Sequence, residues 1–321
     1  MLSALPSWPV FGYADDIRPA LKAAMAAGEP AALATIVGLD GGGPRPVGSQ
    51  MLITSNAISG FLSGGCLEGD VAAHSHAVLA DGAPKTLVYG EGSPWPDIRL
   101  LCGARIVIQL ERILPDDEAA NTLLQFTHSR RRACWISDGV NRLCLPRGIT
   151  IPPPGVFLKD FDPIPRLVVL GSDPTALAIA TLGMQSGFET TLVRPKGPPE
   201  PPPIPGIGYR RDDDPAAALE ALGLDPWTAV AVATHDAELD HAALVAALPS
   251  AAFYVGALGA RRRLADRQIW LRQSGLAEAD IARLHAPIGL DIGGKAPWEV
   301  AVAVLGEITA ERQKRAGALT E

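Results

Sequence analysis

The sequence predicts an α/β protein, with an N-terminal α+β domain on a mixed or antiparallel sheet and a C-terminal Rossmann-like domain with a doubly wound parallel sheet. Three observations support this prediction. In the first half, short apolar runs are separated by turn residues, which is typical of hairpin-rich sheets. In the second half, apolar runs alternate with helical segments, which is typical of βαβ units. The proline-rich stretch 146–165 predicts a linker between domains at 1–145 and 166–321.

The first half is predicted to begin with a helix and to continue as a sheet with one further helix. In the stretch 15–28, apolar residues recur on one helical face, acidic residues lead and Gly28 ends the pattern. A second helix is expected over 67–80. Short apolar runs predict strands at 32–38, 50–54, 58–64, 85–90 and 104–110.

The second half is predicted to alternate between strands and helices. A stiff proline-rich loop is expected at 194–208. A last helix is expected from about Pro297, because proline suits the first helical position. Strands are predicted at 166–171, 189–193, 228–235 and 252–259, with helices at 174–187, 237–248 and 260–275.

The composition argues against several functional classes. The chain has 321 residues and a net charge of −7, so broad affinity for nucleic acid or for a membrane surface is not expected. No apolar run approaches the roughly 20 residues that span a bilayer, and the first residues lack the pattern of a signal peptide. The cysteines at 66, 102, 134 and 144 form no C-x-x-C pair, which favours free thiols in a reducing cytoplasm.

The stretch SGGCLEGD places Cys66 after two glycines and directly before the second predicted helix. The unpaired N–H groups and the dipole of a helix N-terminus favour an anion, and thiolates at such positions are good nucleophiles and metal ligands. Gly64 and Gly65 would let a bulky ligand approach the backbone. Glu68 and Asp70 either oppose a thiolate or complement the dipole. The alternative interpretation is a glycine-rich turn with an incidental cysteine.

A second glycine-rich loop, at 40–49, holds Arg45 between two prolines. A rigid loop with one guanidinium and several N–H groups suits a phosphate or another oxyanion. The alternative is a connecting loop with an exposed arginine. Cys102 stands at the start of a predicted strand, where a cysteine is usually buried and inert, so it matters only if the fold brings it near Cys66.

The first strand and helix of the second half occupy the place of a dinucleotide-binding fingerprint. Gly171, Asp173 and Ala176 stand where that fingerprint has G-x-G-x-x-G/A. Asp173 adds bulk and negative charge where a diphosphate would lie. Arg194 replaces the acid that would hold the ribose hydroxyls. These residues support Rossmann topology and argue against ordinary NAD binding.

Two later loops carry histidines. His235 and Asp236 follow a predicted strand in ATHDAELD, and His285 heads LHAPIGLDIGG with Asp291 behind it. Because parallel sheets bind ligands at the carboxyl ends of their strands, these side chains are candidates for a ligand site. Structural histidines are the alternative. The arginines at 261–263 either bind an anion or form a solvated basic face.

These pieces, in this order, resemble the xanthine dehydrogenase accessory factor family, also called the XdhC/CoxI family. The similarity covers most of the chain. It rests on PRPVGSQMLI, SGGCLEGDV and CGARIVIQLE in the first half, and on 167–178, ATHDAELD, YVGALGARRR and HAPIGLDIGGKAPWEVAVAVLGEI in the second. The chain departs from the family pattern in CGA, where two glycines usually follow the cysteine, in GSDPTA, where many relatives look like GAGHVA, and in Arg194, where they carry an acid.

The resemblance implies an accessory chaperone rather than an enzyme. Such a protein binds molybdenum cofactor of the molybdopterin type, with or without a nucleotide, supports sulfuration of the metal and delivers the cofactor to a xanthine dehydrogenase or aldehyde oxidase-type molybdenum hydroxylase. A cysteine desulfurase is a further expected partner, and NAD(P) is not an expected cofactor. Cys66 would be the molybdenum or persulfide site. The cofactor-associated residues would be Cys66, Cys102, Gly64, Gly65, Glu68, Arg45, His235, Asp236, His285 and Asp291.

Two other functions stay open. An NAD(P)-dependent oxidoreductase would use the C-terminal domain, but the degenerate fingerprint argues against it. A metal-dependent hydrolase would use His235, Asp236 and His285, but no compact ligand spacing such as H-E-x-x-H occurs. We also expect the two domains to form a cleft with Cys66 on one wall, which the two protomers of a homodimer would close jointly.

Overall fold

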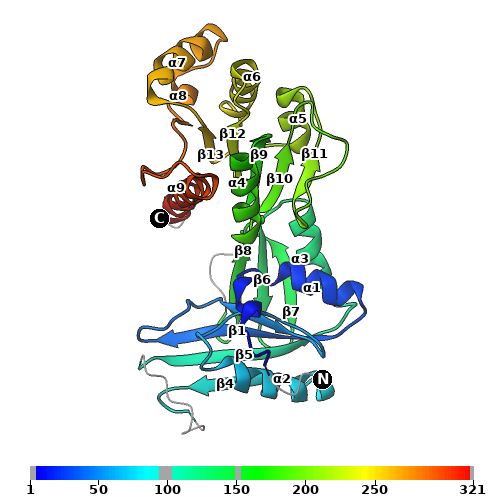
Figure 1. The fold of residues 1–321 in the computed structure, drawn as a ribbon. Helices are drawn as coiled ribbons and strands as arrows, with labels where there is room; N and C mark the ends of the chain where they lie inside the picture. The colour runs from blue at the N-terminus through cyan, green and yellow to red at the C-terminus, as the bar shows by residue number, and fades with distance from the viewer. Residues whose placement is uncertain (1–4, 94–102, 149–152, 319–321) are drawn as a thin grey trace. The chain divides into compact units, whose positions relative to one another are not determined.

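The computed structural model describes residues 5–93, 103–148 and 153–318. The chain divides into two compact units, Met1–Pro163 and Ile164–Glu321, called here the N-terminal unit and the C-terminal unit. Figure 1 shows the helices and strands of both. They have the α/β fold class that the sequence predicts. None of the helices in the described ranges has the length and apolar character needed to cross a membrane.

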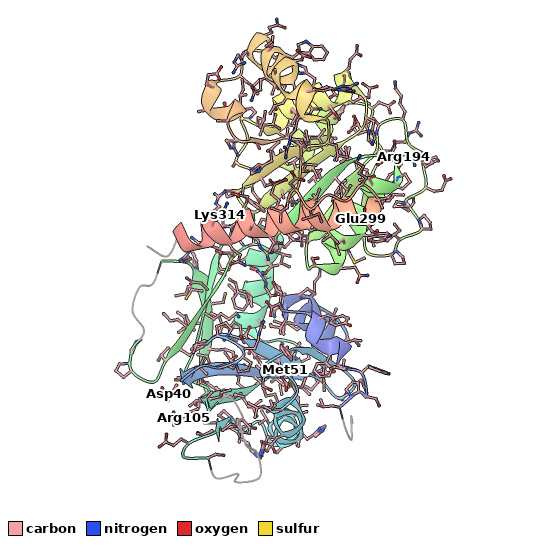
Figure 2. All side chains as sticks on the ribbon, turned by 60° about the vertical axis from the view of Figure 1, so that its left-hand side comes forward. Asp40, Met51, Arg105, Arg194, Glu299 and Lys314 are labelled. Atoms are coloured by element: carbon pink, nitrogen blue, oxygen red, sulfur yellow. The ribbon has the colours of Figure 1, made fainter. Side chains whose placement is uncertain are left out.

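The N-terminal unit is built on a five-stranded sheet with the strand order β3-β2-β1-β5-β4. Each pairing is antiparallel, so the sheet takes the antiparallel form of the two that the sequence allows. Arg105 donates to Asp40 across β5 and β1 at 3.1 Å, and Figure 2 labels both side chains. The strands are β1 Ala31–Asp40, β2 Gln50–Ile53, β3 Ile58–Gly60, β4 Lys85–Tyr89 and β5 Arg105–Ile113.

Helices cover both faces of this sheet, as Figure 1 shows. Alternate residues of β1 point to opposite faces, as the period of a strand requires. Ile36 packs in one apolar cluster with Val71 of α2, whereas Leu33 packs in another with Leu21 of α1. The helices of this unit are α1 Arg18–Ala26, α2 Glu68–Asp81 and α3 Glu118–His128, preceded by a short 3-10 helix, η1, at Val10–Tyr13.

A second, three-stranded antiparallel sheet with the order β7-β6-β8 belongs to the same unit. Its strands are β6 Ala133–Ser137, β7 Arg142–Pro146 and β8 Phe157–Phe161. β8 lies inside the stretch expected as a linker. The prolines there flank this strand rather than interrupt it, and Phe161 is buried in the core. Cys134 and Cys144, both buried and free, are offset by one register position across the hairpin.

The C-terminal unit is built on a six-stranded parallel sheet with the order β11-β10-β9-β12-β13-β14. Counted within this unit, the order is that of a dinucleotide-binding Rossmann fold. The order reverses between β9 and β12, and such folds bind ligands at the carboxyl ends of the strands at this point. The strands are β9 Arg166–Gly171, β10 Glu189–Val193, β11 Gly208–Arg210, β12 Thr228–Ala233, β13 Tyr254–Ala257 and β14 Leu284–His285.

Helices also cover both faces of the parallel sheet (Figure 1). Val169 packs in one cluster with residues of α4 and α9, and Val168 packs in another with residues of α5 and α6. Both faces are therefore buried, which explains why these strands read as continuous apolar runs. The elements are α4 Pro174–Gln185 and α9 Pro297–Ala318 on one face, and α5 Pro215–Leu222, α6 Ala237–Ala247, α7 Leu264–Gln273 and α8 Glu278–Ile281 on the other, with η2 at Arg261–Arg263 before α7.

Candidate functional site

A glycine-rich loop connects β3 to α2 and presents Cys66 to solvent. Gly64 and Gly65 have φ angles of +114° and +103°, a region of backbone space that residues with a Cβ rarely adopt. A Cβ at either position would meet no atom within 4 Å. The backbone conformation, and not crowding, therefore requires glycine. The loop offers bare, accessible backbone beside the thiol.

The Glu68 carboxylate holds this loop from the inside. Its side chain is fully buried, and its oxygens accept hydrogen bonds of 2.7–3.2 Å from the N–H groups of Leu62, Ser63, Gly65 and Leu67 and from the Ser63 hydroxyl. Burial raises the pKa of Glu68, but the hydrogen bonds from Ser63 and Leu62 outweigh burial and bring the pKa below its usual value. Glu68 is among the residues expected at a cofactor. Its oxygens are engaged by the loop itself, so its part is to fix the shape of the loop.

Cys66 lies one residue before the N-cap of α2, which is Leu67. In the first turn of this helix, Asp70 accepts a hydrogen bond from the Tyr89 hydroxyl at 2.6 Å. His74, one turn further, has its Nε2 3.6 Å from the same carboxylate. Burial, followed by the contact with Asp70, raises the pKa of Tyr89, so the phenol keeps the proton that it donates. The start of α2 is thereby tied to the end of β4.

Cys102, the second cysteine of the expected site, lies outside the described residues. The described residues that follow it enter the core at Ala104. Ala104 is buried in the same apolar cluster as Tyr89, and a Cβ at Gly90 would lie 2.1 Å from the Ala104 carbonyl oxygen. The chain that follows Cys102 therefore runs against the end of β4, the strand that contacts the first turn of α2.

Arg45, between β1 and β2, stacks on the aromatic residue that precedes the cysteine loop. Its guanidinium carbon is 5.7 Å from the ring centre of Phe61, and it pairs with Asp15. Its Nε is buried and has no hydrogen-bond partner in the described part of the chain. Lys159 of β8 donates to the Gly48 carbonyl of the same loop at 2.5 Å, and burial lowers the pKa of Lys159 to about 8. The Arg45 guanidinium is therefore incompletely paired, and Lys159 holds the loop that carries Arg45.

In the C-terminal unit, Asp173 and His235 meet where the strand order reverses. Asp173 follows β9, His235 follows β12, and the histidine Nε2 is 3.1 Å from an aspartate oxygen. Asp173 also caps α4 by accepting from the Ala176 N–H at 2.9 Å. Burial raises the pKa of Asp173, but the hydrogen bonds from Ala176 and His235 bring it below its usual value. An internal pair therefore occupies the position of the first phosphate subsite.

The other expected residues of this unit have separate partners. Asp236 caps α6 with its carboxylate. His285 stacks on the tyrosine that begins β13, with 4.5 Å between ring centres, and its Nδ1 lies 3.3 Å from Glu307 of α9. Asp291 forms an exposed ion pair of 2.8 Å with the first arginine of η2. Arg194, labelled in Figure 2 beyond the end of β10, has a buried Nε without a hydrogen-bond partner in the described ranges.

A pocket of about 550 Å³ lies beside His235, between α6 and α7. The sequence pointed to His235 and to the arginines of 261–263, but not to the pocket residues on the two helices. A usable signal was the charged and aromatic content of the α7 segment, LADRQIWLRQ, which has no strong apolar stripe. The lining of the pocket includes His235, Asp240, His241, Arg263, Arg267 and Trp270.

A metal-dependent hydrolase finds no support in the geometry. Within 5–93, 103–148 and 153–318, no group of three or more His, Cys, Asp or Glu side chains is arranged to hold a metal ion. His235 is engaged with Asp173, and His285 with Glu307.

The fold and these sites define a two-unit α/β protein that combines a cysteine-bearing loop with a Rossmann unit in which Asp173 and His235 pair where the strand order reverses. The chain belongs to the XdhC/CoxI family. The XdhC Rossmann domain matches residues 167–308, and the XdhC and CoxI family matches residues 24–90. The resemblance predicted from the motifs is therefore confirmed, and the matched ranges contain both the cysteine loop and the pocket.

Three relatives illustrate the similarity. The molybdenum cofactor insertion chaperone PaoD of Escherichia coli is 30% identical, with 93% of this chain and 89% of that protein covered. A Bacillus subtilis protein described as a probable xanthine dehydrogenase subunit is 25% identical, with 89% of this chain and 94% of that protein covered. A crystal structure described as a xanthine dehydrogenase from Bacillus halodurans has a TM-score of 0.74 at 22% identity, covers 94% of this chain and 96% of its own, and shares the fold.

Proposed function

We propose that this protein is an accessory chaperone that binds molybdenum cofactor and inserts it into a molybdenum hydroxylase of the xanthine dehydrogenase or aldehyde oxidase type. The observation that carries the proposal is the exposed Cys66 on a loop whose shape the buried Glu68 fixes. The similarity to PaoD, a molybdenum cofactor insertion chaperone, over 93% of the chain supports it.

Cys66 is suited to hold the cofactor at its metal. A molybdenum centre bound by a pterin dithiolene is soft, and thiolates suit soft metals. The bare backbone of Gly64 and Gly65 lets a large pterin approach the thiol. Arg45, with its unpartnered Nε, offers positive charge to the phosphate of the pterin. Because the loop is held by its own hydrogen bonds to Glu68, it can keep its shape when the cofactor leaves.

Sulfuration of the metal fits the same thiol. An exposed cysteine can carry sulfur as a persulfide, and a cysteine desulfurase is the class of partner that would supply it. Cys134 and Cys144 are poor carriers because burial raises their pKa values to about 11 and about 12. Cys102 is the second cysteine in this proposal.

The proposed setting is the cytoplasm, with the protein acting as a homodimer. The free thiols of Cys134 and Cys144 support a reducing compartment. Light scattering on the purified protein tests the dimer, and one protomer per particle would exclude it.

An NAD(P)-dependent oxidoreductase is the other function that the fold brings to mind, because the C-terminal unit has the strand order of dinucleotide-binding proteins. The pair of Asp173 and His235 speaks against it, because a carboxylate lies where a diphosphate would need free N–H groups. We therefore favour the chaperone.

The experiment is to mix the purified protein with molybdenum cofactor, remove the unbound cofactor, and measure the pterin and metal that stay with the protein. Cys66→Ser should lose most of the retained metal. Cys134→Ala, which also removes one thiol of the N-terminal unit but from a buried position, should retain it. Equal retention by the wild-type protein and Cys66→Ser would sink the proposed site, and no retention by the wild-type protein would sink the proposed function.

A further inference from the structure

Two residues that line the pocket beside His235, Asp240 and Arg267, form an ion pair. Arg267 of α7 donates to Asp240 of α6 at 3.2 Å, and the two side chains are 17% and 8% exposed. Arg267 also donates to the Leu258 carbonyl at 3.2 Å. Asp240 accepts from the N–H and the hydroxyl of Thr234, at 3.2 and 2.6 Å. These contacts join the ends of β12 and β13 to both helices, so the pocket is preformed.

One wall of the pocket is aromatic. His241 and Trp270 meet edge to face, with 5.8 Å between their ring centres. His241 uses its Nε2 on Ser274, at 2.8 Å, and its Nδ1 is buried without a hydrogen-bond partner among the described residues. Trp270 is 48% exposed, which leaves much of its ring free for contact with a ligand. A planar heteroaromatic ring fits such a wall, because it can stack on the exposed face of the indole.

One arginine of the pocket lining is unpaired in the described part of the chain, whereas the neighbouring arginines on α7 are not. The arginines of α7 itself are paired, Arg267 with Asp240 and Arg272 with Glu278. Arg263 lines the pocket, and its guanidinium has no hydrogen-bond or ion-pair partner within the described ranges. An unpaired guanidinium favours a phosphate or another oxyanion. Asp266 also lines the pocket, and an acid at a nucleotide site commonly accepts from ribose hydroxyls.

The place of the pocket in the fold agrees with its chemistry. A Rossmann sheet consists of two mononucleotide-binding halves that meet where the strand order reverses. The half that begins with β9 is closed by Asp173 and His235. The pocket lies in the other half, at the ends of β12 and β13, and its volume of about 550 Å³ is within the range of small-molecule sites, roughly 300–1,000 Å³.

We propose that this pocket binds a nucleoside monophosphate, with the base against Trp270 and His241 and the phosphate on Arg263. Free nucleotide and the nucleotide portion of a larger molecule share this chemistry. The inference goes beyond the proposed chaperone function, because it concerns the C-terminal unit alone and does not depend on Cys66 or on molybdenum.

The test is isothermal titration calorimetry of the full chain with each of the four ribonucleoside monophosphates, with inorganic phosphate and a nucleoside as partial ligands. At least one monophosphate should bind with a Kd below about 1 mM, which is about −4.1 kcal/mol. Phosphate and nucleoside alone should bind more weakly. Absence of binding by all four monophosphates would overturn the inference.

Four variants locate the binding. Arg263→Ala and Trp270→Ala should each weaken it about tenfold or more, because they remove the charge and the stacking surface. Arg272→Ala and Ile269→Ala are matched controls on the same helix, with similarly exposed side chains outside the pocket lining, and should leave binding unchanged. If both pocket variants bind as the wild-type protein does, the nucleotide binds elsewhere. The same conclusion follows if the control variants lose binding as well.

One further variant separates this inference from the proposed function. Cys66→Ser should bind the monophosphate as the wild-type protein does, whether or not it retains molybdenum cofactor. Weakened nucleotide binding in Cys66→Ser would contradict an independent pocket. If Cys66→Ser retains both nucleotide binding and cofactor binding undiminished, only the proposed role of Cys66 in cofactor binding is contradicted.

Discussion

Cys66 differs from the two other cysteines in the described ranges chiefly in its access to solvent. Cys134 is 1% exposed and Cys144 is 7% exposed, and burial raises their pKa values to about 11 and about 12. Both are therefore protonated and shielded at neutral pH. Cys66 stands exposed on its loop. A single residue thus combines thiol chemistry with accessibility in the described part of the N-terminal unit.

We predict that a thiol alkylator at neutral pH labels Cys66 much faster than Cys134 or Cys144. Brief labelling followed by peptide mapping measures this directly. Labelling of Cys134 and Cys144 should reach the rate of Cys66 only after denaturation, which serves as the internal control. Equal rates in the native protein would mean that the loop does not expose its thiol.

Glu68 is the residue on which the shape of the cysteine loop depends most. Glu68→Gln should lower the free energy of unfolding of the N-terminal unit by about 1–3 kcal/mol, because an amide leaves some of the buried N–H donors unsatisfied. Thermal unfolding at pH 7 measures the loss. Glu118→Gln is a matched control, since Glu118 is likewise the first residue of a helix in this unit but is exposed. Equal stability of the two variants would contradict the anchoring role.

The pH dependence of Glu68 follows from the direction of its pKa shift. The folded-state pKa is lower than the ordinary value of 4.5, so the carboxylate stabilises the fold fully above pH 4.5. That stabilisation is lost as the pH falls through the lowered folded-state pKa. The stability difference between the wild-type protein and Glu68→Gln should therefore shrink on acidification below pH 4.5. A difference that is constant down to about pH 3 would assign the effect to packing instead of charge.

At the scale of elements, the buried parallel strands were the most predictable part of the fold. β9 and β10 occupy the predicted ranges 166–171 and 189–193, because continuous apolar runs bounded by Pro165 and Gly171, or by Gly187 and Arg194, leave little choice of boundary. β3 ends at Gly60 instead of running to residue 64. The cause is Glu68, which takes the N–H groups of Leu62 and Ser63 out of reach of a sheet ladder.

The sequence analysis did not predict several elements, among them α3, α5, β6 and β7. Two further missed elements are short edge strands next to proline. β8 and β11 lie beside proline-rich stretches, and their strand character depends on pairing with β6 and β10. Tertiary pairing therefore decides them, and local composition does not. The cysteine loop could be predicted because its signals are contiguous in sequence. The pair of Asp173 and His235, 62 positions apart, could not, because it requires knowledge that β9 and β12 are neighbours.

The junction of β9 and α4 carries a prediction about nucleotides. Titration with NADH or NADPH should show no tight binding, because Asp173 caps α4 and pairs with His235 where a diphosphate would lie. A Kd near 1 µM, about −8.2 kcal/mol, would contradict this. Asp173→Gly should strengthen dinucleotide binding. Asp214→Gly removes an equivalent N-cap from α5, away from this junction, and should not.

At the scale of the whole molecule, the apolar cores follow the division into two units. The two clusters of the N-terminal unit contain described residues from 17–161 only, and the two clusters of the C-terminal unit contain residues from 167–308 only. Each unit therefore buries its own sheet with its own helices. This arrangement is expected of domains that can fold separately.

We predict that a fragment comprising residues 164–321 folds without the N-terminal unit. It contains the complete parallel sheet and the helices of both faces, including α9, which packs on α4 through the cluster that contains Val304. The fragment should show α/β circular dichroism and a cooperative thermal transition. A matched fragment that ends before α9 should fail, because it uncovers one face of the sheet. If the fragment 164–321 is unfolded while the full chain is stable, the N-terminal unit must supply part of its stability. If it folds, nucleotide binding can be measured on the fragment alone, and binding equal to that of the full chain would assign the nucleotide to the C-terminal unit.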